Sequence, residues 1–404
     1  MNYASNNLKN VLHGFFLAVA LTIAEPSTTL PLIVHHFSAN EAVVGLFTSL
    51  LRGGAILVQL VAAFFAQSYT QMMPYLKRVF VARFLSWLSI GVAILILGDK
   101  NPTLTLLAIG IGLFIFSFSA GFGSIYFNEI LAKVFTHEER GRSMANRQFF
   151  AAIGSILSGA VAGYILQHFT PPQSFGYLFI VSAFFMAIGL FAFSTIKEPP
   201  KKQIEKSRKF ADFFKNALTT LKEDRRLQVQ ILVVLLSYSF LFSFAFIILQ
   251  AKSSIDLSGY LVGGFITIQM TGALLGNLIY KRLSPNFKLI ITLSFLFAIT
   301  AYTNLLFSQK AANFFIAFFL LGMAVDGFRI ASMNLLLLIA PESKRPLYIA
   351  LQNNLTSIGL FFAVPGGLIV HYFGYTILYT FTICMLSLGL VIAWLKLPKS
   401  GIDA

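Results

Sequence analysis

Four charged side chains lie deep inside long apolar stretches of the chain. They are Glu25, Arg52, Asp326 and Arg329. A charge at the centre of a bilayer costs about 2.5–3.5 kcal/mol on the insertion scale, so such a residue needs a partner or a function. Each carboxylate has an arginine that could neutralise it. Two interpretations are open: these groups bind a polar solute and exchange a proton, or they form ion pairs that only lock helices together.

The spacing of these residues predicts two separate pairs. Glu25 and Arg52 each lie eleven residues from the predicted outer end of their span, at residues 36 and 41, so they share a depth on neighbouring helices. Asp326 and Arg329 are three residues apart, which places them on one face of one helix. Because i,i+3 pairing on one helix can be self-contained, the structural interpretation carries more weight for the second pair.

Prolines interrupt two of the apolar stretches. Pro26 and Pro31 follow Glu25 and remove backbone donors from the outer half of the first span. The sequence therefore predicts a kinked helix with unpaired carbonyls. Such a segment is tolerated against protein or a water-filled cavity but not against lipid. Pro365 and the two glycines after it predict a similar interruption near the end of the chain.

The chain that carries these groups is too apolar for a soluble protein. Of its 404 residues, 57% are hydrophobic and 11% are charged, whereas soluble domains are about 45–50% apolar and about 25% charged. The 30 Lys and Arg residues exceed the 15 Asp and Glu residues. They lie mostly in short segments between apolar runs, which excludes a nucleic-acid-binding face. The single cysteine, Cys384, excludes an intramolecular disulfide.

Twelve apolar runs are long enough to cross a bilayer, which takes about 20 helical residues. The predicted spans are 11–36, 41–66, 77–98, 103–131, 144–168, 174–196, 227–250, 257–280, 287–308, 312–339, 347–372 and 375–396. Most connections between them are short, so successive helices are expected to be antiparallel neighbours. The fold class predicted is an all-α integral membrane protein.

Lysine and arginine are unevenly divided between the two sets of loops. The termini and every second loop, counted with the span ends that adjoin them, hold 25 of these residues, among them Arg83 and Arg147. The alternate loops hold three, and the other two, Arg52 and Arg329, lie deep within spans. Because positive residues favour the cytoplasmic side, both termini are predicted in the cytoplasm. We expect a multi-pass protein of the plasma (inner) membrane with an uncleaved first span.

The longest connection divides the chain into two halves. Pro199 and Pro200 end the sixth span. The expected domains are an amino-terminal six-helix bundle, residues 1–198, a cytoplasmic linker, residues 199–226, and a carboxy-terminal six-helix bundle, residues 227–404. Apolar residues in the linker recur with helical spacing and alternate with lysines and arginines. This pattern predicts an amphipathic helix on the inner leaflet.

The two halves repeat each other in sequence. Residues 43–57 resemble residues 261–275 at a constant offset of 218, which relates the second span to the eighth. Residues 140–154 resemble residues 345–359 at an offset of 205, which relates the fifth span to the eleventh. Two parallel six-span repeats joined by a cytoplasmic linker are typical of one large class of transporters.

Over its whole length this arrangement resembles the major facilitator superfamily. The superfamily's loop signature between spans two and three is degenerate here, as Ala66 to Arg78, and lacks its aspartate. The second-half counterpart, Gly276 to Arg282 followed by Lys288, is closer to that signature, and Glu139 to Arg142 resembles the loop after span four. The resemblance implies two pseudo-symmetric six-helix bundles that rock around a mid-membrane cavity.

Polar residues near the predicted inner ends of spans four and eleven, with the loop arginines beside them, are candidates for a cytoplasmic gate. They are Glu129, Arg140, Arg142, Arg345, Gln352 and Asn353. Two interpretations are open: hydrogen bonding between the two halves on the cytoplasmic side, or simple solvation at the membrane interface.

The sequence shows no signature of an enzyme or of a metal site. His35 and His36 have no cysteine nearby, and no strand precedes a glycine pair. We therefore predict a secondary active transporter that moves a small organic solute, either coupled to protons or by exchange, without a cofactor. It is expected to function as a monomer among membrane lipids. The alternative is a membrane receptor or assembly scaffold built on a degenerate transporter fold.

Overall fold

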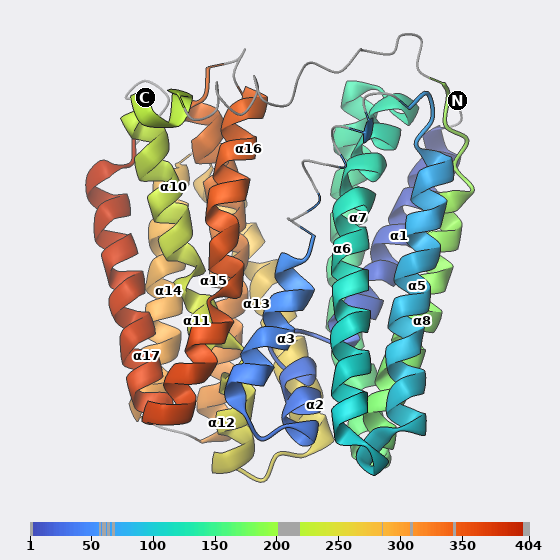
Figure 1. Ribbon diagram of the computed structural model, residues 1–404. Coiled ribbons are helices and arrows are strands. Elements are labelled where there is room, and N and C mark those ends of the chain that lie inside the picture. Colours follow the sequence, from blue (N-terminus) through green and yellow to red (C-terminus); the bar gives the residue numbers. More distant parts are fainter. Residues whose placement is uncertain are drawn as a thin grey trace. The chain divides into compact units, whose positions relative to one another are not determined.

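The computed structural model is built from α-helices and short 3-10 turns (Figure 1). It describes residues 3–55, 58, 62, 65–66, 69–200, 219–284, 286–307, 310–341 and 345–398. No strand occurs among these residues. Nine helices within the described ranges are long and apolar enough to cross a membrane. The predicted all-α membrane fold is therefore confirmed. The predicted amphipathic helix of the linker lies largely outside the described residues, because 201–218 are not among them.

The chain forms two compact units. Unit 1 comprises residues 1–39, 47–207 and 257–267. It contains α1 (Tyr3–Ile23), α2 (Thr29–Phe37), most of α3 (Glu41–Gly53), α5 (Met73–Ile96), η1 (Gly98–Lys100), α6 (Pro102–Val134), α7 (His137–His168) and α8 (Gln173–Ser194). Helix α1 packs against α7 and α8, and α5 packs against α6 and α8 (Figure 1). Trp87, Phe179 and Phe193 lie fully buried in the core of this unit.

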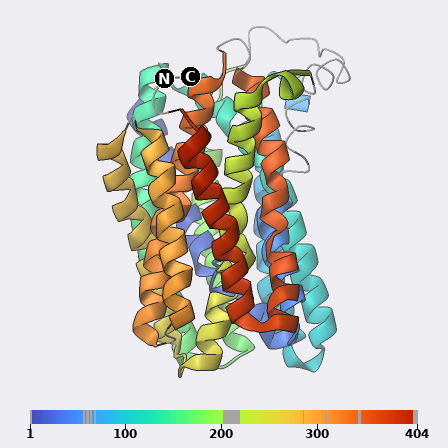
Figure 2. The same ribbon diagram turned by 90° about the vertical axis from the view of Figure 1, so that its left-hand side faces the viewer.

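Unit 2 comprises residues 40–46, 208–256 and 268–404. It contains α10 (Arg225–Ser237), η2 (Tyr238–Phe240), α11 (Leu241–Phe244), α12 (Ile247–Ser254), most of α13 (Gly259–Leu283), α14 (Phe287–Phe307), α15 (Ala311–Ile339), α16 (Arg345–Thr356), η4 (Ser357–Phe361) and α17 (Ala363–Lys396). Helix α14 packs against α15 and α17, and Figure 2 shows α17, in red, beside α14, in orange. The first turns of α3 thus pack within unit 2, and those of α13 within unit 1.

The nine long helices of the described ranges account for most of the twelve predicted spans. Eight of them correspond to spans three to ten, and the ninth, Leu347–Lys396, covers spans eleven and twelve. That stretch turns at Gly374, whose φ of 80° is a conformation that favours glycine. Span one is divided into α1 and α2, and span two is described only in part. The count of nine therefore reflects the break in span one, the joining of spans eleven and twelve, and the part of span two that lies outside the described residues.

The sequence repeat is accompanied by a repeated close approach between helices. A Cβ atom on Gly54, directly after α3, would lie 2.9 Å from the side chain of Ser117 on α6. A Cβ atom on Gly272, the related position in α13, would lie 2.1 Å from the carbonyl oxygen of Phe319 on α15. At both places only glycine leaves room for the neighbouring helix. Spans two and four in one half are therefore packed like spans eight and ten in the other.

Candidate functional site

Span one is interrupted between α1 and α2, around Glu25. The proline after Glu25 lacks a backbone donor, so the helical ladder cannot continue there. The carbonyl of Glu25 accepts hydrogen bonds from the N–H groups of Thr28 and Leu30, each at 3.2 Å. The hydroxyl of Thr29 donates to the carbonyl of Ile23 at 2.8 Å. The predicted kink is confirmed, but these two carbonyls find partners within the segment instead of remaining unpaired.

The carboxylate of Glu25 faces the arginine that the sequence pairs with it. Nη2 of Arg52 lies 3.9 Å from Oε1 of Glu25, and the two side chains are 24% and 13% exposed. This distance is longer than a hydrogen bond, so the contact is a looser attraction between charges. The hydroxyl of Ser27 donates to the same Oε1 at 3.0 Å. Because the contact is loose, the carboxylate of Glu25 can change its partner with only a small movement of the side chains.

Buried hydroxyl groups cluster in the segments that carry this pair. Ser27 and Thr28 follow Glu25, and Thr48 and Ser49 come just before Arg52 on α3; all four are buried. In the part of the chain that the structure describes, the hydroxyl oxygens of Thr28 and Ser49 have no hydrogen-bond partner. A buried hydroxyl without a partner is costly, so these two are suited to hydrogen-bond to a polar solute.

The second pair is held more tightly and within a single helix. Nη2 of Arg329 lies 2.9 Å from Oδ1 of Asp326, one turn away on α15. The side-chain amide of Asn277, on α13, donates to Oδ2 of the same carboxylate at 2.7 Å. Arg329 is 58% exposed, whereas Asp326 is 19% exposed. Both predicted pairs are therefore observed, and their roles in binding or coupling stay predictions.

The six gate candidates lie in different surroundings. Gln352 is buried within unit 2, where its side-chain oxygen accepts a hydrogen bond at 3.2 Å from Gln230 of α10. Asn353 and Arg142 are exposed, and Glu129 and Arg345 are half-buried. Arg140 lines a shallow hollow in unit 1. Gln352 thus has a partner in its own unit, and the proposed gate stays a prediction.

One charged site escaped the sequence analysis. Glu198, at the end of unit 1's last span, has a side chain that is 1% exposed, and its Oε1 lies 2.6 Å from Nζ of Lys133. The same carboxylate accepts the N–H groups of Met72 and Met73, at 2.7–2.9 Å. Glu198 therefore caps the amino terminus of α5, which has no cap from its own segment. In the sequence, Glu198 stands out only as an acidic residue before two prolines, and this pattern does not show that its side chain is buried.

Two arginines that were counted with the cytoplasmic loops lie well inside helices. Arg83 is ten residues into α5, and Arg147 is ten residues into α7. Nη1 of Arg147 approaches Nδ1 of His13 on α1 to 2.6 Å. Sequence counting placed both arginines among the topology signals because they are close to helix starts. Only the packed bundle shows that they turn inward.

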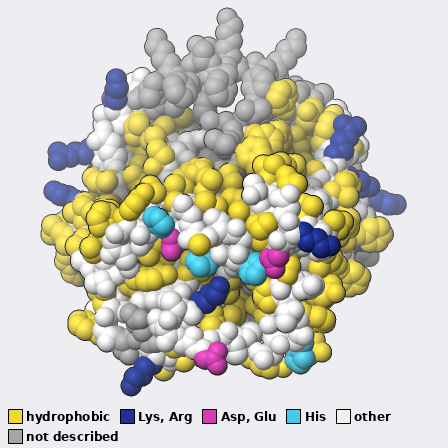
Figure 3. All heavy atoms as spheres, turned by 60° about the horizontal axis from the view of Figure 1, so that its bottom comes forward, with side chains coloured by type: hydrophobic (Ala, Val, Ile, Leu, Met, Phe, Trp, Pro, Cys, Tyr) yellow, Lys and Arg dark blue, Asp and Glu magenta, His cyan; other side chains and the backbone are white. Residues whose placement is uncertain are grey.

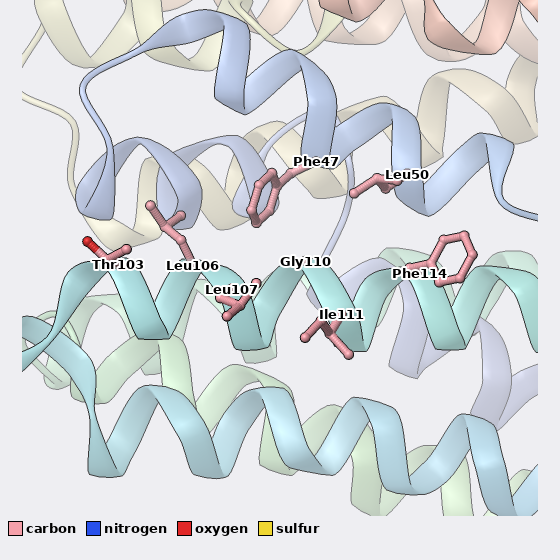
Figure 4. Close-up of a pocket in the computed structure, with 8 residues that line it drawn as sticks. All are labelled: Phe47, Leu50, Thr103, Leu106, Leu107, Gly110, Ile111 and Phe114. Carbon is pink, nitrogen blue, oxygen red and sulfur yellow. The ribbon is translucent and has the colours of Figure 1, made fainter.

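An apolar groove lies between α3 and α6 of unit 1, as Figure 4 shows. Its lining residues, none of them charged, are Phe47, Leu50, Thr103, Leu106, Leu107, Gly110, Ile111 and Phe114. On α6 the aromatic rings continue past Phe114 at intervals of four residues, through Phe118 and Phe122 to Tyr126, with centroids 5.5–6.2 Å apart. Helix α6 therefore carries an aromatic stripe, which the sequence alone does not single out among the chain's 44 phenylalanines.

Each of the two units contains a contact between a histidine and an acidic residue. Nε2 of His36 lies 2.8 Å from Oδ1 of Asp99 in unit 1. Nδ1 of His371 lies 2.8 Å from Oε2 of Glu41 in unit 2. Figure 3 shows histidine side chains beside acidic ones. Among the described residues, no group of three or more ligands suited to a metal ion occurs.

Comparison with known proteins identifies the class of this all-helical membrane protein. The family model of the Major Facilitator Superfamily matches residues 12–309 and 252–403. The chain therefore belongs to the Major Facilitator Superfamily, and the resemblance inferred from its motifs is confirmed. It is an integral, multi-pass membrane protein. A search of curated proteins gives no significant match.

Solved structures share this fold at low sequence identity. A D-xylose-proton symporter aligns with a TM-score of 0.75 at 15% identity, covering 99% of both chains. The inward-open xylose transporter XylE from E. coli aligns with a TM-score of 0.73 at 14% identity, covering 99% of this chain and 97% of that one. The nucleoside transporter NupG gives 0.72 at 15% identity, covering 96% and 98%. These similarities establish the fold.

Proposed function

We propose that the protein is a secondary active transporter that moves a small organic solute across the membrane by alternating access, coupled to protons or to exchange. The observation that carries this proposal is the Glu25–Arg52 pair at the break between α1 and α2. Broken helices near mid-membrane are where transporters of related architecture bind solutes and coupling ions. Relatives in fold that are named as a proton symporter and a nucleoside transporter support the same conclusion.

The pair has the chemistry that coupling requires. Partial burial favours the neutral form of a carboxyl group, whereas the positive charge of Arg52 favours the ionised form. A solute anion that approaches Arg52 weakens the second effect, so Glu25 takes up a proton when the solute binds. When the solute leaves, Arg52 again favours the ionised carboxylate and the proton is released. The 3.9 Å separation leaves room for this change of partner.

The Asp326–Arg329 pair is proposed as the second-half contribution to solute binding. Arg329 is 58% exposed and can therefore offer donors to a solute while Asn277 keeps hold of Asp326. With both signs of charge present, anions, cations and zwitterions are all compatible with these two pairs. The protein is proposed to work as a monomer surrounded by lipid, with both termini in the cytoplasm. Reporter fusions at the two termini and within 199–226 test that orientation.

Counterflow in vesicles tests the function directly. Purified protein is first screened against a metabolite library by thermal shift, because a ligand that prefers the folded state raises its apparent stability. The protein is then reconstituted into vesicles, and the vesicles are loaded with each stabilising solute. Uptake of the same solute in labelled form is measured. Accumulation that depends on internal solute, or on an imposed pH gradient, supports transport. Solute binding without any flux would instead support the receptor or scaffold alternative.

A further inference from the structure

Unit 1 contains a basic cluster, made of one buried histidine and two half-buried arginines, that is separate from the Glu25–Arg52 pair. It consists of His13 on α1, Arg83 on α5 and Arg147 on α7. Each of these residues lies ten positions into its helix, counted from the end that the sequence predicts to be cytoplasmic. At a rise of about 1.5 Å per residue they share a depth of about 15 Å. Arg147 contacts the imidazole of His13, and the positive charge of Arg83 also acts on that ring, but less strongly.

Arg147 is inserted against α1 instead of extending toward water. Its Nη1 donates to Nδ1 of His13 at 2.6 Å and to the carbonyl of Asn10 at 3.2 Å. Its Cγ would lie 2.4 Å from a Cβ atom on Gly14, so the glycine makes room for the arginine side chain. An arginine that served only as a topology signal would extend to the membrane surface. Arg147 therefore has a role inside the bundle.

The hydrogen bonds of the cluster leave donors without acceptors. Because an arginine cannot accept a hydrogen bond, Nδ1 of His13 must be the acceptor and Nε2 must carry the proton. His13 is 3% exposed, and its Nε2 has no partner among the described residues. The same holds for the buried Nε of Arg83. The interior of unit 1 thus presents buried N–H groups that no described oxygen or nitrogen accepts.

No carboxylate compensates this charge in the described part of the chain. Neither arginine has an acidic oxygen within 4.0 Å among the described residues. Their guanidinium groups lie over aromatic rings: Arg83 is 4.4 Å from the ring of Phe116, and Arg147 is 4.8 Å from that of Phe127. Such contacts offset only part of the cost of removing two charges from water.

We infer that this cluster, His13 with Arg83 and Arg147, binds the oxyanion of a carboxylate or phosphate group. An ionised oxyanion has acceptors only and so matches a set of groups that offers donors only. It also supplies the negative charge that the described residues do not. The anion comes either from a soluble compound on the predicted cytoplasmic side or from the headgroup of an anionic lipid. This inference goes beyond the proposed transport and does not depend on Glu25.

The chain contains its own reporter for this site. Trp87 lies one turn after Arg83 on α5, and its ring is 4.3 Å from Phe116, the ring that Arg83 covers. The only other tryptophan is Trp394 in unit 2. In the full-length Trp394→Phe protein, fluorescence therefore reports on Trp87 alone. The protein in detergent is titrated with inorganic phosphate and with acetate, using sodium chloride at matched ionic strength as the reference.

A saturable change in Trp87 fluorescence is expected. Arg83→Gln should weaken the apparent affinity about tenfold or more, because a hydrogen bond to a charged group is worth about 1.5–3 kcal/mol. The side chain of Arg83 has no hydrogen-bond partner among the described residues, so Arg83→Gln is expected to fold. Arg147→Gln would instead lose the hydrogen bonds to His13 and Asn10 and is expected to misfold. The matched control is Arg78→Gln, which removes an exposed arginine from the same helix, also over an aromatic ring, that of Tyr75.

A second arm separates the two sources of the anion. The Trp394→Phe protein is placed in nanodiscs of phosphatidylcholine alone or mixed with phosphatidylglycerol. A response to phosphate or acetate that Arg83→Gln weakens and Arg78→Gln preserves supports a site for soluble anions. A response seen only with phosphatidylglycerol, and lost in Arg83→Gln, supports a lipid headgroup. No response in either arm, or a response equal in Arg83→Gln and the unsubstituted protein, would overturn the inference.

Discussion

The two intramembrane ion pairs have the same components but differ in how the backbone holds them. Glu25 lies in the break between α1 and α2, and Arg52 lies on α3, with 3.9 Å between the charged atoms. Asp326 and Arg329 share one unbroken helix and lie 2.9 Å apart, and Asn277 adds a second hydrogen bond to the carboxylate. A pair that bridges two segments can separate when either segment moves. A pair within one helix moves as a unit, so its contact is insensitive to such motion.

The same contrast appears in the helix breaks. The break in span one contains a proline and an acid, whereas the break in span seven, between α10 and α12, contains neither. In span seven the hydroxyl of Tyr302 donates to the carbonyl of Phe240 at 2.7 Å, and the hydroxyls of Ser243 and Thr382 lie 2.6 Å apart. Unit 2 therefore stabilises its break with neutral groups. Of these two breaks, only the one in unit 1 contains a charged residue, Glu25.

The substitution Glu25→Gln should have the largest effect. It preserves shape and hydrogen bonding but cannot release a proton, so transport driven by a pH gradient should be lost while solute exchange continues. Proteoliposomes with and without a pH gradient measure both activities. If Glu25→Gln retains full pH-driven transport, Glu25 is a structural partner of Arg52 and Asp326 becomes the coupling candidate.

Glu198 tests what a tightly held ion pair with a buried carboxylate contributes to stability. Glu198→Ala leaves the ammonium group of Lys133 and the N–H groups of Met72 and Met73 without their acceptor. Breaking a buried pair by removing one partner costs about 3–5 kcal/mol, so a marked fall in thermal stability is expected. The double substitution Glu198→Ala, Lys133→Met should recover part of that loss. An unchanged melting temperature for the single variant would show that the capping of α5 is dispensable.

Removal of each arginine compares the two pairs directly. Arg52→Ala leaves a partly buried carboxylate without its charge partner, and about 1–3 kcal/mol of stability should be lost. The double substitution Glu25→Gln, Arg52→Ala should be more stable than Arg52→Ala alone. Arg329→Ala is the matched control, with an expected cost of at most about 1 kcal/mol because Arg329 is exposed. Chemical unfolding of the three variants measures the order, and equal losses for both arginines would contradict the comparison.

Asp326→Asn should alter solute binding more than coupling. It removes one charge from the Arg329 contact, and the KM for the solute should change by about tenfold or less, in line with a single charge-assisted hydrogen bond. The dependence of transport on a pH gradient should remain. If Asp326→Asn lost this dependence and Glu25→Gln kept it, the Asp326–Arg329 pair would be the coupling site and the Glu25–Arg52 pair would not.

The smallest effect is expected at the loop arginines. Arg140 and Arg345 occupy repeat-related positions, and Arg140 lines a hollow together with Asn128. If these loops restrict access from the cytoplasm, replacing both arginines by glutamine should speed maleimide labelling of a cysteine introduced at Asn128. The background is Cys384→Ser, because Cys384 is the chain's single cysteine and is exposed. Unchanged labelling would leave the arginines as topology signals.

The sequence by itself determined the class of protein, the long helices and the two candidate pairs. Hydropathy, loop charge and repeats are properties of segments, and each residue contributes to them independently of its partners. The kink after Glu25 was predictable for the same reason, because a proline acts on its own backbone. The i,i+3 contact of Asp326 with Arg329 was predictable because both residues belong to one helix.

Only the tertiary structure decided which buried groups meet. Glu198 reaches Lys133 and the start of α5 across 65 residues or more, and Arg147 reaches His13 across 134. The break in span seven has no proline to announce it, and its Phe240 carbonyl accepts a hydrogen bond from the hydroxyl of Tyr302 on another helix. Burial and partner choice depend on how helices pack, and packing is set by side chains that are distant in the chain. Composition and spacing therefore do not reveal that Arg147, which was counted with a cytoplasmic loop, packs inside the bundle.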